Sequence, residues 1–186
     1  MAATRDQLLD DALGFLNRRP TATTSEIAAA IGVSRATLHR HFASRDALIV
    51  EIGERATDRW ERTQSDAGME AATASGDPAA LEAALRELLG RFVADAHDFA
   101  VVLTDEFVLD HPEIHARSER LLEREVAFYA AAQEAGVLRR DLPARWIADV
   151  VYGLMVAARD ARRQGDVAER DLPDHVLTTF LRGAGR

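Results

Sequence analysis

The segment from Thr23 to Arg45, with the sequence TTSEIAAAIGVSRATLHRHFASR, constrains the fold of this chain more than any other. Thr24 belongs to the residue types that cap a helix, because its hydroxyl can accept a hydrogen bond from an unpaired N–H in the first turn. Apolar residues then recur at helical spacing at Ile27, Ala28 and Ile31. Gly32 follows, and glycine can end a helix in the left-handed conformation. The pattern predicts a short helix that stops at a glycine turn.

A second short helix is predicted directly after this turn. Ser34 can cap it, and Leu38 and Phe42 lie four residues apart, so both face the same side of the helix. Ala28 is small at the place where the two helices must cross closely. Two short helices joined by a glycine-containing turn form a helix-turn-helix, whose second helix can enter the major groove of DNA.

This segment resembles the N-terminal DNA-binding domain of the TetR family of transcriptional regulators. The resemblance covers about residues 5–50; His39 stands where the family usually carries an aromatic residue, and Arg45 where it usually carries Lys. It implies a DNA-binding domain over residues 1–47 and a helical ligand-sensing and dimerisation domain over residues 48–186. The matching positions are Thr24, Ile27, Ala28, Ile31, Gly32, Val33, Ser34, Thr37, Leu38, Arg40, His41, Phe42, Ser44 and Arg45.

Composition and periodicity favour an all-α fold. Of the 186 residues, 47% are hydrophobic and none is Cys, and no segment shows the alternation of a half-buried strand. We expect about nine helices, of which the first three form the DNA-binding domain. Residues 65–78 are weakly patterned and predict a linker. The helices are expected at about 4–18, 24–30, 34–41, 44 to beyond 60, 78–96, 99–110, 113–135, 143–164 and 173–182.

The net charge of −8 is unevenly distributed along the chain. Residues 1–50 hold six Arg and five acidic residues and carry +1, whereas the remainder holds 17 Arg and 26 acidic residues and carries −9. A near-neutral N-terminal part on an acidic body favours docking to DNA in one orientation. The polar N-terminus, the lack of an apolar run of about 18 residues and the absence of Cys predict a cytoplasmic protein without a membrane partner or a disulfide.

Helical geometry predicts which side chains face double-stranded DNA. If Leu38 points inward, Ala36 and Arg40 point outward, since each lies two residues away. Arg35, which flanks this face, can pair with guanine, and Thr37 or Ala36 can contact the methyl group of thymine. The resemblance implies base and phosphate contacts from this helix and a phosphate contact from Arg45; the alternative is an ordinary solvated helix face. The predicted DNA-binding residues are Thr24, Ser25, Ser34, Arg35, Ala36, Thr37, His39, Arg40, His41 and Arg45.

Two apolar stripes near the C-terminus predict a dimer. Over residues 147–158 the apolar positions recur at i, i+3, i+4, i+7, i+8 and i+11, and a shorter stripe covers 176–181. The resemblance implies that these two helices pair with their two-fold mates in a four-helix bundle, and two-fold symmetry matches a palindromic operator. The alternative is that both stripes face the core of the monomer. The predicted interface residues are Ile147, Val150, Val151, Leu154, Ala158, Val176, Leu177, Phe180 and Leu181.

The resemblance also implies a ligand cavity among the fourth to eighth helices. Its candidate lining residues are aromatic residues and a methionine at helical spacing, and the alternative for each is an ordinary core position. Asp105 and Glu106 interrupt the apolar run VVLTDEFVL, so one of them either faces the cavity, where it would favour a cationic ligand, or lies on the surface. The charged run from Glu113 to Glu125 predicts a solvated helix face. The predicted ligand-binding residues are Trp60, Phe92, Phe107, Phe128, Tyr129, Trp146, Tyr152 and Met155.

The sequence contains no glycine-rich phosphate loop, nucleophile elbow or zinc-protease motif, so we predict neither an enzyme nor a cofactor. His97, His111 and His115 form the only histidine cluster outside the helix-turn-helix, and Pro112 interrupts the face that the last two would share, so no metal site is predicted. We predict a homodimeric repressor that a small molecule releases from its operator. The alternatives are an activator or partner-controlled regulator without a small-molecule ligand, and a helical-bundle enzyme or metal carrier.

Overall fold

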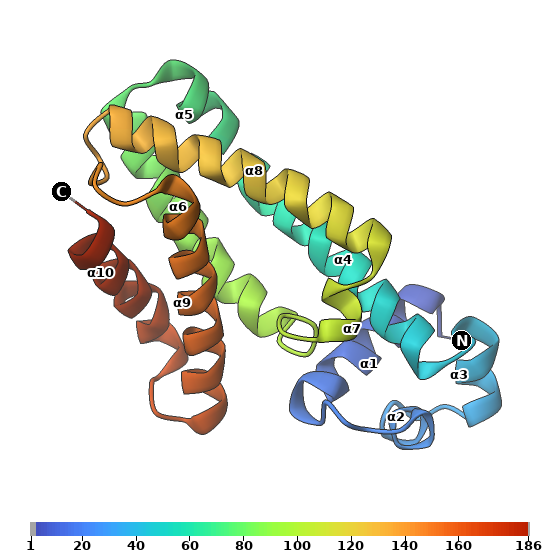
Figure 1. The fold of residues 1–186 in the computed structure, drawn as a ribbon. Coiled ribbons are helices and arrows are strands. Elements are labelled where there is room, and N and C mark those ends of the chain that lie inside the picture. The colour runs from blue at the N-terminus through green and yellow to red at the C-terminus, as the bar shows by residue number, and fades with distance from the viewer. Residues whose placement is uncertain (1–2, 186) are drawn as a thin grey trace.

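The computed structural model describes residues 3–185, which form ten α-helices and one short 3₁₀ turn. Figure 1 shows α1 to α3 as a small lobe at one end of the molecule, from which α4 runs into a bundle of the later helices. The predicted all-α class is confirmed, with one helix more than expected. The helices are α1 (Arg5–Arg18), α2 (Thr24–Ala30), α3 (Arg35–His41), α4 (Arg45–Asp66), α5 (Met69–Ser75), α6 (Pro78–Asp98), α7 (Glu106–Leu109), α8 (Pro112–Glu134), α9 (Ala144–Gln164) and α10 (Leu172–Ala184), and the 3₁₀ turn is Glu169–Asp171.

The additional helix is α5, and it lies in the segment that was predicted to be a linker. Gly68 and Gly76 flank it in the left-handed conformation, with φ of 68° and 63°, and so separate it from α4 and α6. Met69 and Ala72 are buried in the bundle core. The linker prediction was wrong because a helix of seven residues with only two buried side chains is too short to show a clear helical period.

The helix predicted over residues 99–110 is also wrong, because only Glu106–Leu109 is helical. The Asp105 side chain accepts a hydrogen bond from the Val108 backbone N–H and caps α7, so it starts a new helix instead of continuing one. The preceding apolar run forms tight turns, which bury Val101 and Val102.

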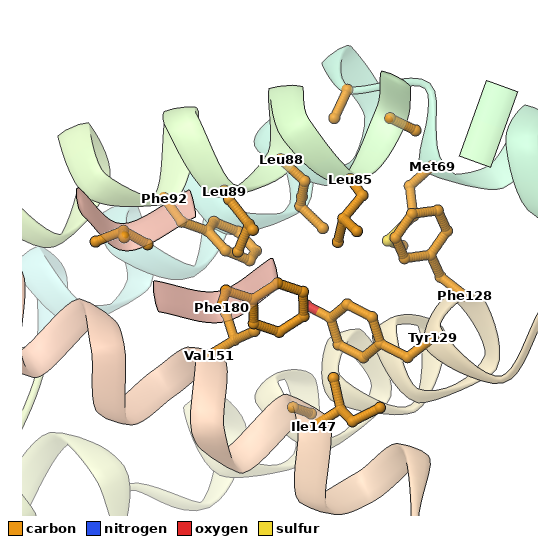
Figure 2. Packing of buried hydrophobic residues seen from close by; sticks show 14 of the residues in the cluster. Met69, Leu85, Leu88, Leu89, Phe92, Phe128, Tyr129, Ile147, Val151 and Phe180 are labelled. Carbon is orange, nitrogen blue, oxygen red and sulfur yellow. The ribbon is translucent and has the colours of Figure 1, made fainter. Parts of the chain in front are cut away.

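The bundle core lies between α6 on one side and α8, α9 and α10 on the other. In Figure 2, the side chains of Leu85, Leu88, Leu89 and Phe92 point from α6 toward those of the other three helices. The rings of Phe128 and Tyr129, both on α8, lie 5.6 Å apart between centroids and are fully buried. The apolar stripes of the long helices therefore meet within one protomer to a large extent.

A second apolar cluster, which we call the head core, holds the N-terminal lobe together. Leu8 and Leu16 of α1, Ile27 of α2 and Leu38 of α3 are almost completely buried in it. Residues outside the first 47 complete this cluster, so the lobe is not packed as an independent unit. They are Leu48, Ile49 and Ile52 of α4 and Phe99, Val101, Val102, Val108 and Ile114 of the segment 99–114.

Asn17 fixes the lobe to the end of α6. Its Nδ2 donates a hydrogen bond of 2.7 Å to the carbonyl of Asp98, and its Oδ1 accepts one of 3.0 Å from the backbone N–H of Val101. Because the amide side chain both donates and accepts, it holds α1 and the segment 99–114 in one relative position. Among residues 3–185, no helix combines the length and the apolar character that crossing a membrane requires.

Candidate DNA interface and ligand cavity

The first helix of the helix-turn-helix, α2, starts at Thr24 as predicted, but its capping residue lies one position earlier than the sequence indicated. Thr23, not Thr24, is the capping residue, because its hydroxyl accepts a hydrogen bond of 3.3 Å from the Glu26 N–H. The Glu26 carboxylate accepts one of 2.8 Å from the Thr23 N–H in return, which makes a capping box. Thr24 is instead the first residue of α2, and Ser25 beside it is exposed.

The turn between α2 and α3 is a Schellman motif centred on Gly32. Gly32 has a φ of 73°. Its N–H donates to the carbonyl of Ala29, and the N–H of Val33 donates to that of Ala28, over 3.3 Å and 3.0 Å. A side chain at Gly32 would be strained at this φ, so glycine is needed for the angle between the two helices.

The helix α3 presents its cationic face to solvent. Ser34 caps it by accepting a hydrogen bond of 3.0 Å from the Thr37 N–H, and Leu38 anchors it in the head core. Arg35 and Arg40 form no ion pair with any residue in the range 3–185, so nothing described here neutralises their charges. The exposed residues of α3 are Arg35, Ala36, His39 and Arg40, while Thr37 and His41 are half-buried.

The guanidinium of Arg45, which was predicted to contact a DNA phosphate, is hydrogen-bonded within the protein. Its Nε donates to the carbonyl of Ala22 over 3.1 Å, and its Nη2 donates to that of Pro20 over 2.5 Å. The guanidinium therefore ties the start of α4 to the loop between α1 and α2 and leaves fewer donors for DNA.

Arg5 is a positioning residue that sequence reasoning missed. It pairs with Glu51 of α4, donates to the carbonyl of His41 and lies 4.8 Å from the ring centroid of Phe42. Its charge thus lies at the C-terminal end of α3, where carbonyl groups and the helix dipole favour a cation. No local pattern reveals it, because its partners are 36 and 46 residues away along the chain.

A cavity of about 350 Å³ lies among α4, α6, α7, α8 and α9. Four of the eight predicted ligand-binding residues line it, namely Trp60, Phe92, Tyr152 and Met155. Phe128 and Tyr129 are fully buried in the bundle core, and neither lines the cavity. Phe107 and Trp146 are 52% and 54% exposed and also lie outside the lining. Helical spacing selected apolar faces but not the faces that border empty space.

Glu125 is the buried acid of this cavity, although the sequence predicted a solvated face around it. The carboxylate accepts hydrogen bonds from Trp60 Nε1 and from Gln64 Nε2, the latter over 2.9 Å, and a longer one of 3.4 Å from the Tyr129 hydroxyl. Burial raises the pKa of Glu125 to about 7, although these hydrogen bonds act in the opposite direction. Glu125 lies on the inward side of α8 because α4 packs against it there.

The other acids near the cavity differ in exposure. Asp95 accepts a hydrogen bond of 2.5 Å from Thr63 and lies 3.6 Å from Arg59, and desolvation raises its pKa. Asp149 also lines the cavity but is exposed. Asp105 caps α7 and Glu106 is exposed, so neither of the two acids singled out from the sequence lines the cavity.

The cavity and the head core share a wall. Phe99, Val102, Val108 and Ile114 belong to the head core and also line the cavity. The same side chains therefore border the cavity and support α1 to α3. This contiguity arises because segment 99–114 packs on α4 between the two parts of the molecule.

A larger cleft of about 1180 Å³ lies between α1 and the C-terminal ends of α6 and α9. Five of its seven arginines form ion pairs, among them Arg55 with Asp10 and Arg162 with Glu169. The cleft is thus lined mainly by compensated charges. Within residues 3–185 there is no group of three or more His, Cys, Asp or Glu side chains arranged to hold a metal ion.

Comparison with known proteins identifies the chain. Residues 8–52 match the family described as bacterial regulatory proteins, tetR family. The chain is 31% identical over 183 residues to the HTH-type transcriptional repressor LfrR of Mycolicibacterium smegmatis, which covers 97% of this chain and 89% of LfrR. This chain belongs to the TetR family. The HTH-type transcriptional regulator NfxB of Pseudomonas aeruginosa is also 31% identical, over 89% of this chain and 86% of NfxB.

Solved structures of TetR regulators have the same fold. The ketosteroid transcriptional regulator KstR2 of Mycobacterium tuberculosis superposes with a TM-score of 0.78 at 21% identity, over 100% of this chain and 97% of KstR2. LfrR in complex with proflavine gives a TM-score of 0.76 at 26% identity, over 96% of this chain and 94% of LfrR. The predicted family is confirmed, and this TetR protein is a DNA-binding transcriptional regulator, not an enzyme.

Proposed function

We propose that this TetR regulator is a homodimeric repressor whose release from a palindromic operator follows binding of a small molecule in the 350 Å³ cavity. The observation that carries the proposal is the shared wall, since Phe99, Val102, Val108 and Ile114 both line the cavity and support the helix-turn-helix. LfrR, a named repressor, has been crystallised with proflavine, which supports the ligand-responsive form. A solid core without a cavity would have favoured the alternative, a regulator that works without a small-molecule ligand.

For the DNA contacts, we propose that α3 enters the major groove with Arg35, Ala36, Thr37 and His39 toward the bases. Arg40 would contact a phosphate, since its side chain is exposed and without an ion pair in residues 3–185. We also propose contacts with the sugar-phosphate backbone of the DNA from Thr24, Ser25, Ser34 and His41. For Arg45 the proposed role changes to positioning, because its guanidinium holds the loop between α1 and α2.

For the dimer, we propose an interface on the outer face of α9 and α10, which lie side by side at one edge of the molecule (Figure 1). Five of the nine predicted interface residues, Ile147, Val151, Ala158, Val176 and Phe180, are buried in the protomer's own core and are removed from the proposal. The half-buried residues Val150, Leu154, Leu177 and Leu181 remain. Exposed Trp146 lies one helical turn before Val150 and extends this face.

We propose that residues 1–47 bind DNA and that residues 48–186 bind the ligand and form the dimer. Segment 99–114 connects the two parts, because its side chains pack in the head core. An occupant of the cavity would move this segment and α4, and would thereby change the distance between the two recognition helices of the dimer. Half-sites one turn apart require a spacing of about 34–36 Å. A 100-fold release requires that the ligand prefer the DNA-free conformation by about 2.7 kcal/mol.

The test is binding of the purified protein to a labelled fragment of the DNA just upstream of its own gene, over a series of salt concentrations. We expect tight, salt-sensitive binding to one short palindrome, weakened in Arg40→Ala and unchanged in Arg120→Ala. Arg120 is the matched control because it is an exposed arginine without an ion pair in the described residues, and it lies on α8, outside the helix-turn-helix. Weak binding that is equal on unrelated DNA would contradict the proposal.

A further inference from the structure

We infer that the effector of this protein is an organic cation with a flat apolar body, and that Glu125 in the cavity is its counter-ion. That this ligand regulates DNA binding rests on the proposed function, whereas its binding to the cavity does not and can be measured without DNA.

The charges that line the cavity all have the same sign. Asp95, Glu125 and Asp149 line it, but none of the arginines or histidines among residues 3–185 does, in a chain that has 23 basic residues and six histidines. An anionic ligand such as a carboxylate or a phosphate ester would meet three acids and no cation at this wall. A cationic ligand would meet a charge complement at every acidic position.

Glu125 is the one of these three acids that is buried and that forms no ion pair with any side chain in the described range 3–185. Its hydrogen bonds come from the neutral donors Trp60, Gln64 and Tyr129. By contrast, Asp95 has Arg59 at 3.6 Å, and Asp149 is exposed to water. A buried carboxylate without a counter-ion is unfavourable in its charged form, and a ligand cation at hydrogen-bond or ion-pair distance would remove that penalty.

The titratable groups around Glu125 leave room for such a cation. Tyr129 faces it from α8 itself, and Trp60 and Gln64 face it from α4, but none of them is positively charged. From α6 and α9, the titratable groups that reach the same cavity are Asp95, Asp149 and Tyr152, and none of them is cationic. No cationic side chain in the part of the chain that the structure describes lines this cavity, so a cation beside Glu125 would be supplied by the ligand.

The remaining walls fit the flat apolar body of such a ligand. Trp60, Phe92, Phe99 and Tyr152 line the cavity together with aliphatic side chains. The Tyr152 hydroxyl donates to the carbonyl of Leu103 over 3.0 Å, which holds one ring in place. Aromatic faces attract cations and stack on planar rings. The volume of about 350 Å³ is within the usual range for small-molecule sites.

The experiment compares three tricyclic probes of similar shape and different charge by titration calorimetry of the full-length protein at pH 8. N-methylacridinium is a permanent cation, acridine is uncharged at this pH, and an anthracene carboxylate is an anion. We expect the cation to bind at least tenfold more tightly than the neutral compound, and the anion not to bind. In Glu125→Gln we expect the tenfold preference to disappear while binding of acridine is kept.

Glu123→Gln is the matched control, because Glu123 is an exposed acid on the same helix and the substitution makes the same change in charge. It should leave all three affinities unchanged. The wild-type series is decisive even if Glu125→Gln does not fold. Asp149→Asn, at the exposed side of the cavity, should reduce the preference for the cationic probe by less than Glu125→Gln does.

Equal affinity for cation and neutral probe, tighter binding of the anion, or no binding of the cation would each overturn the inference. So would a Glu125→Gln protein with an unchanged preference. Operator release is measured separately: a cation that binds through Glu125 without releasing DNA would support the inference and contradict the proposed function. Release of DNA by ligands that show no preference for positive charge would do the reverse.

Discussion

Gly53 of α4 lies so close to Val108 of α7 that a Cβ on Gly53 would come within 2.5 Å of Val108 Cγ1. The missing side chain allows α7 to pack directly on α4 between the cavity and the head core. Val108 is buried and β-branched, so it cannot turn away without moving its backbone. The backbone of Gly53 has the ordinary α-helical conformation, so glycine is required here by close packing and not by its φ angle.

We predict that Gly53→Ala destabilises the protein by about 1–3 kcal/mol, because overpacking outweighs the higher helix propensity of alanine. Urea denaturation measures the change. Gly14→Ala is the matched control: Gly14 lies inside α1 with open space where its Cβ would be, and alanine there should stabilise by about 1 kcal/mol. If both variants gained stability, the close approach of α7 to α4 would be refuted.

Arg40→Ala and Arg45→Ala should separate DNA contact from positioning. Because Arg40 is exposed, Arg40→Ala should weaken operator binding by about 1–3 kcal/mol without changing the melting temperature. Arg45→Ala should instead lower the free energy of unfolding by about 1–3 kcal/mol, because two backbone carbonyls lose a charged donor. Operator titration and thermal melting of each variant check this. An Arg45→Ala protein with wild-type stability and weakened DNA binding would restore the phosphate contact to Arg45.

Glu125 should make stability depend on pH. Its pKa is raised to about 7 in the folded protein from an ordinary value of 4.5, so the folded state binds more protons than the unfolded state between these values. Stability contributed by this group is therefore highest below pH 4.5 and decreases until the pH exceeds about 7. The free energy of unfolding of Glu125→Gln should consequently rise relative to that of the wild type between pH 5 and pH 8, by on the order of 3 kcal/mol.

The measurement is the difference in unfolding free energy between wild type and Glu125→Gln, since the titration of other groups cancels in that difference. Glu123→Gln, exposed on the same helix, should show a difference from wild type that does not change with pH. A flat difference for Glu125→Gln as well would mean that Glu125 is not buried in the folded protein.

Asn17→Ala should loosen the connection between α1 and the segment 99–114. The backbone N–H of Val101 would lose its acceptor, and the carbonyl of Asp98 would lose a donor. We expect roughly tenfold faster hydrogen exchange at residues 99–104, equivalent to about 1.4 kcal/mol of local stability. Asn17→Asp keeps an acceptor for Val101 and should preserve part of the protection; unchanged exchange in Asn17→Ala would argue against this link.

Val150→Arg tests the proposed dimer. Val150 is half-buried on α9 and is not part of the bundle core, so an arginine there should leave the protomer folded but place a charge in the interface. We expect a monomer in sedimentation experiments and a loss of operator binding. Ala116→Arg, at an exposed position on α8, should remain dimeric. A Val150→Arg protein that is still a dimer would require a different interface.

The helix-turn-helix could be predicted because its determinants are local. Ser34 caps α3 through a residue three positions away, and Gly32 provides the left-handed turn by virtue of having no side chain. Leu38 and Phe42 show the inner face through their spacing alone. These signals act within a few residues, so they were sufficient to indicate the family, although the sequence placed the cap of α2 at Thr24 and the structure places it at Thr23.

Interactions between distant segments were decided only by the tertiary structure. An apolar stripe shows which face of a helix is buried but not what covers it: Val151 packs within the protomer while Val150, one position away, stays outside the core. Glu125 is buried because α4 covers that side of α8, and Arg5 reaches Glu51 across 46 residues of sequence. The sequence determined the helices and the motif, because these depend on neighbouring residues. Packing decided the cavity, its charge and its link to the DNA-binding helices, because these depend on which surfaces meet.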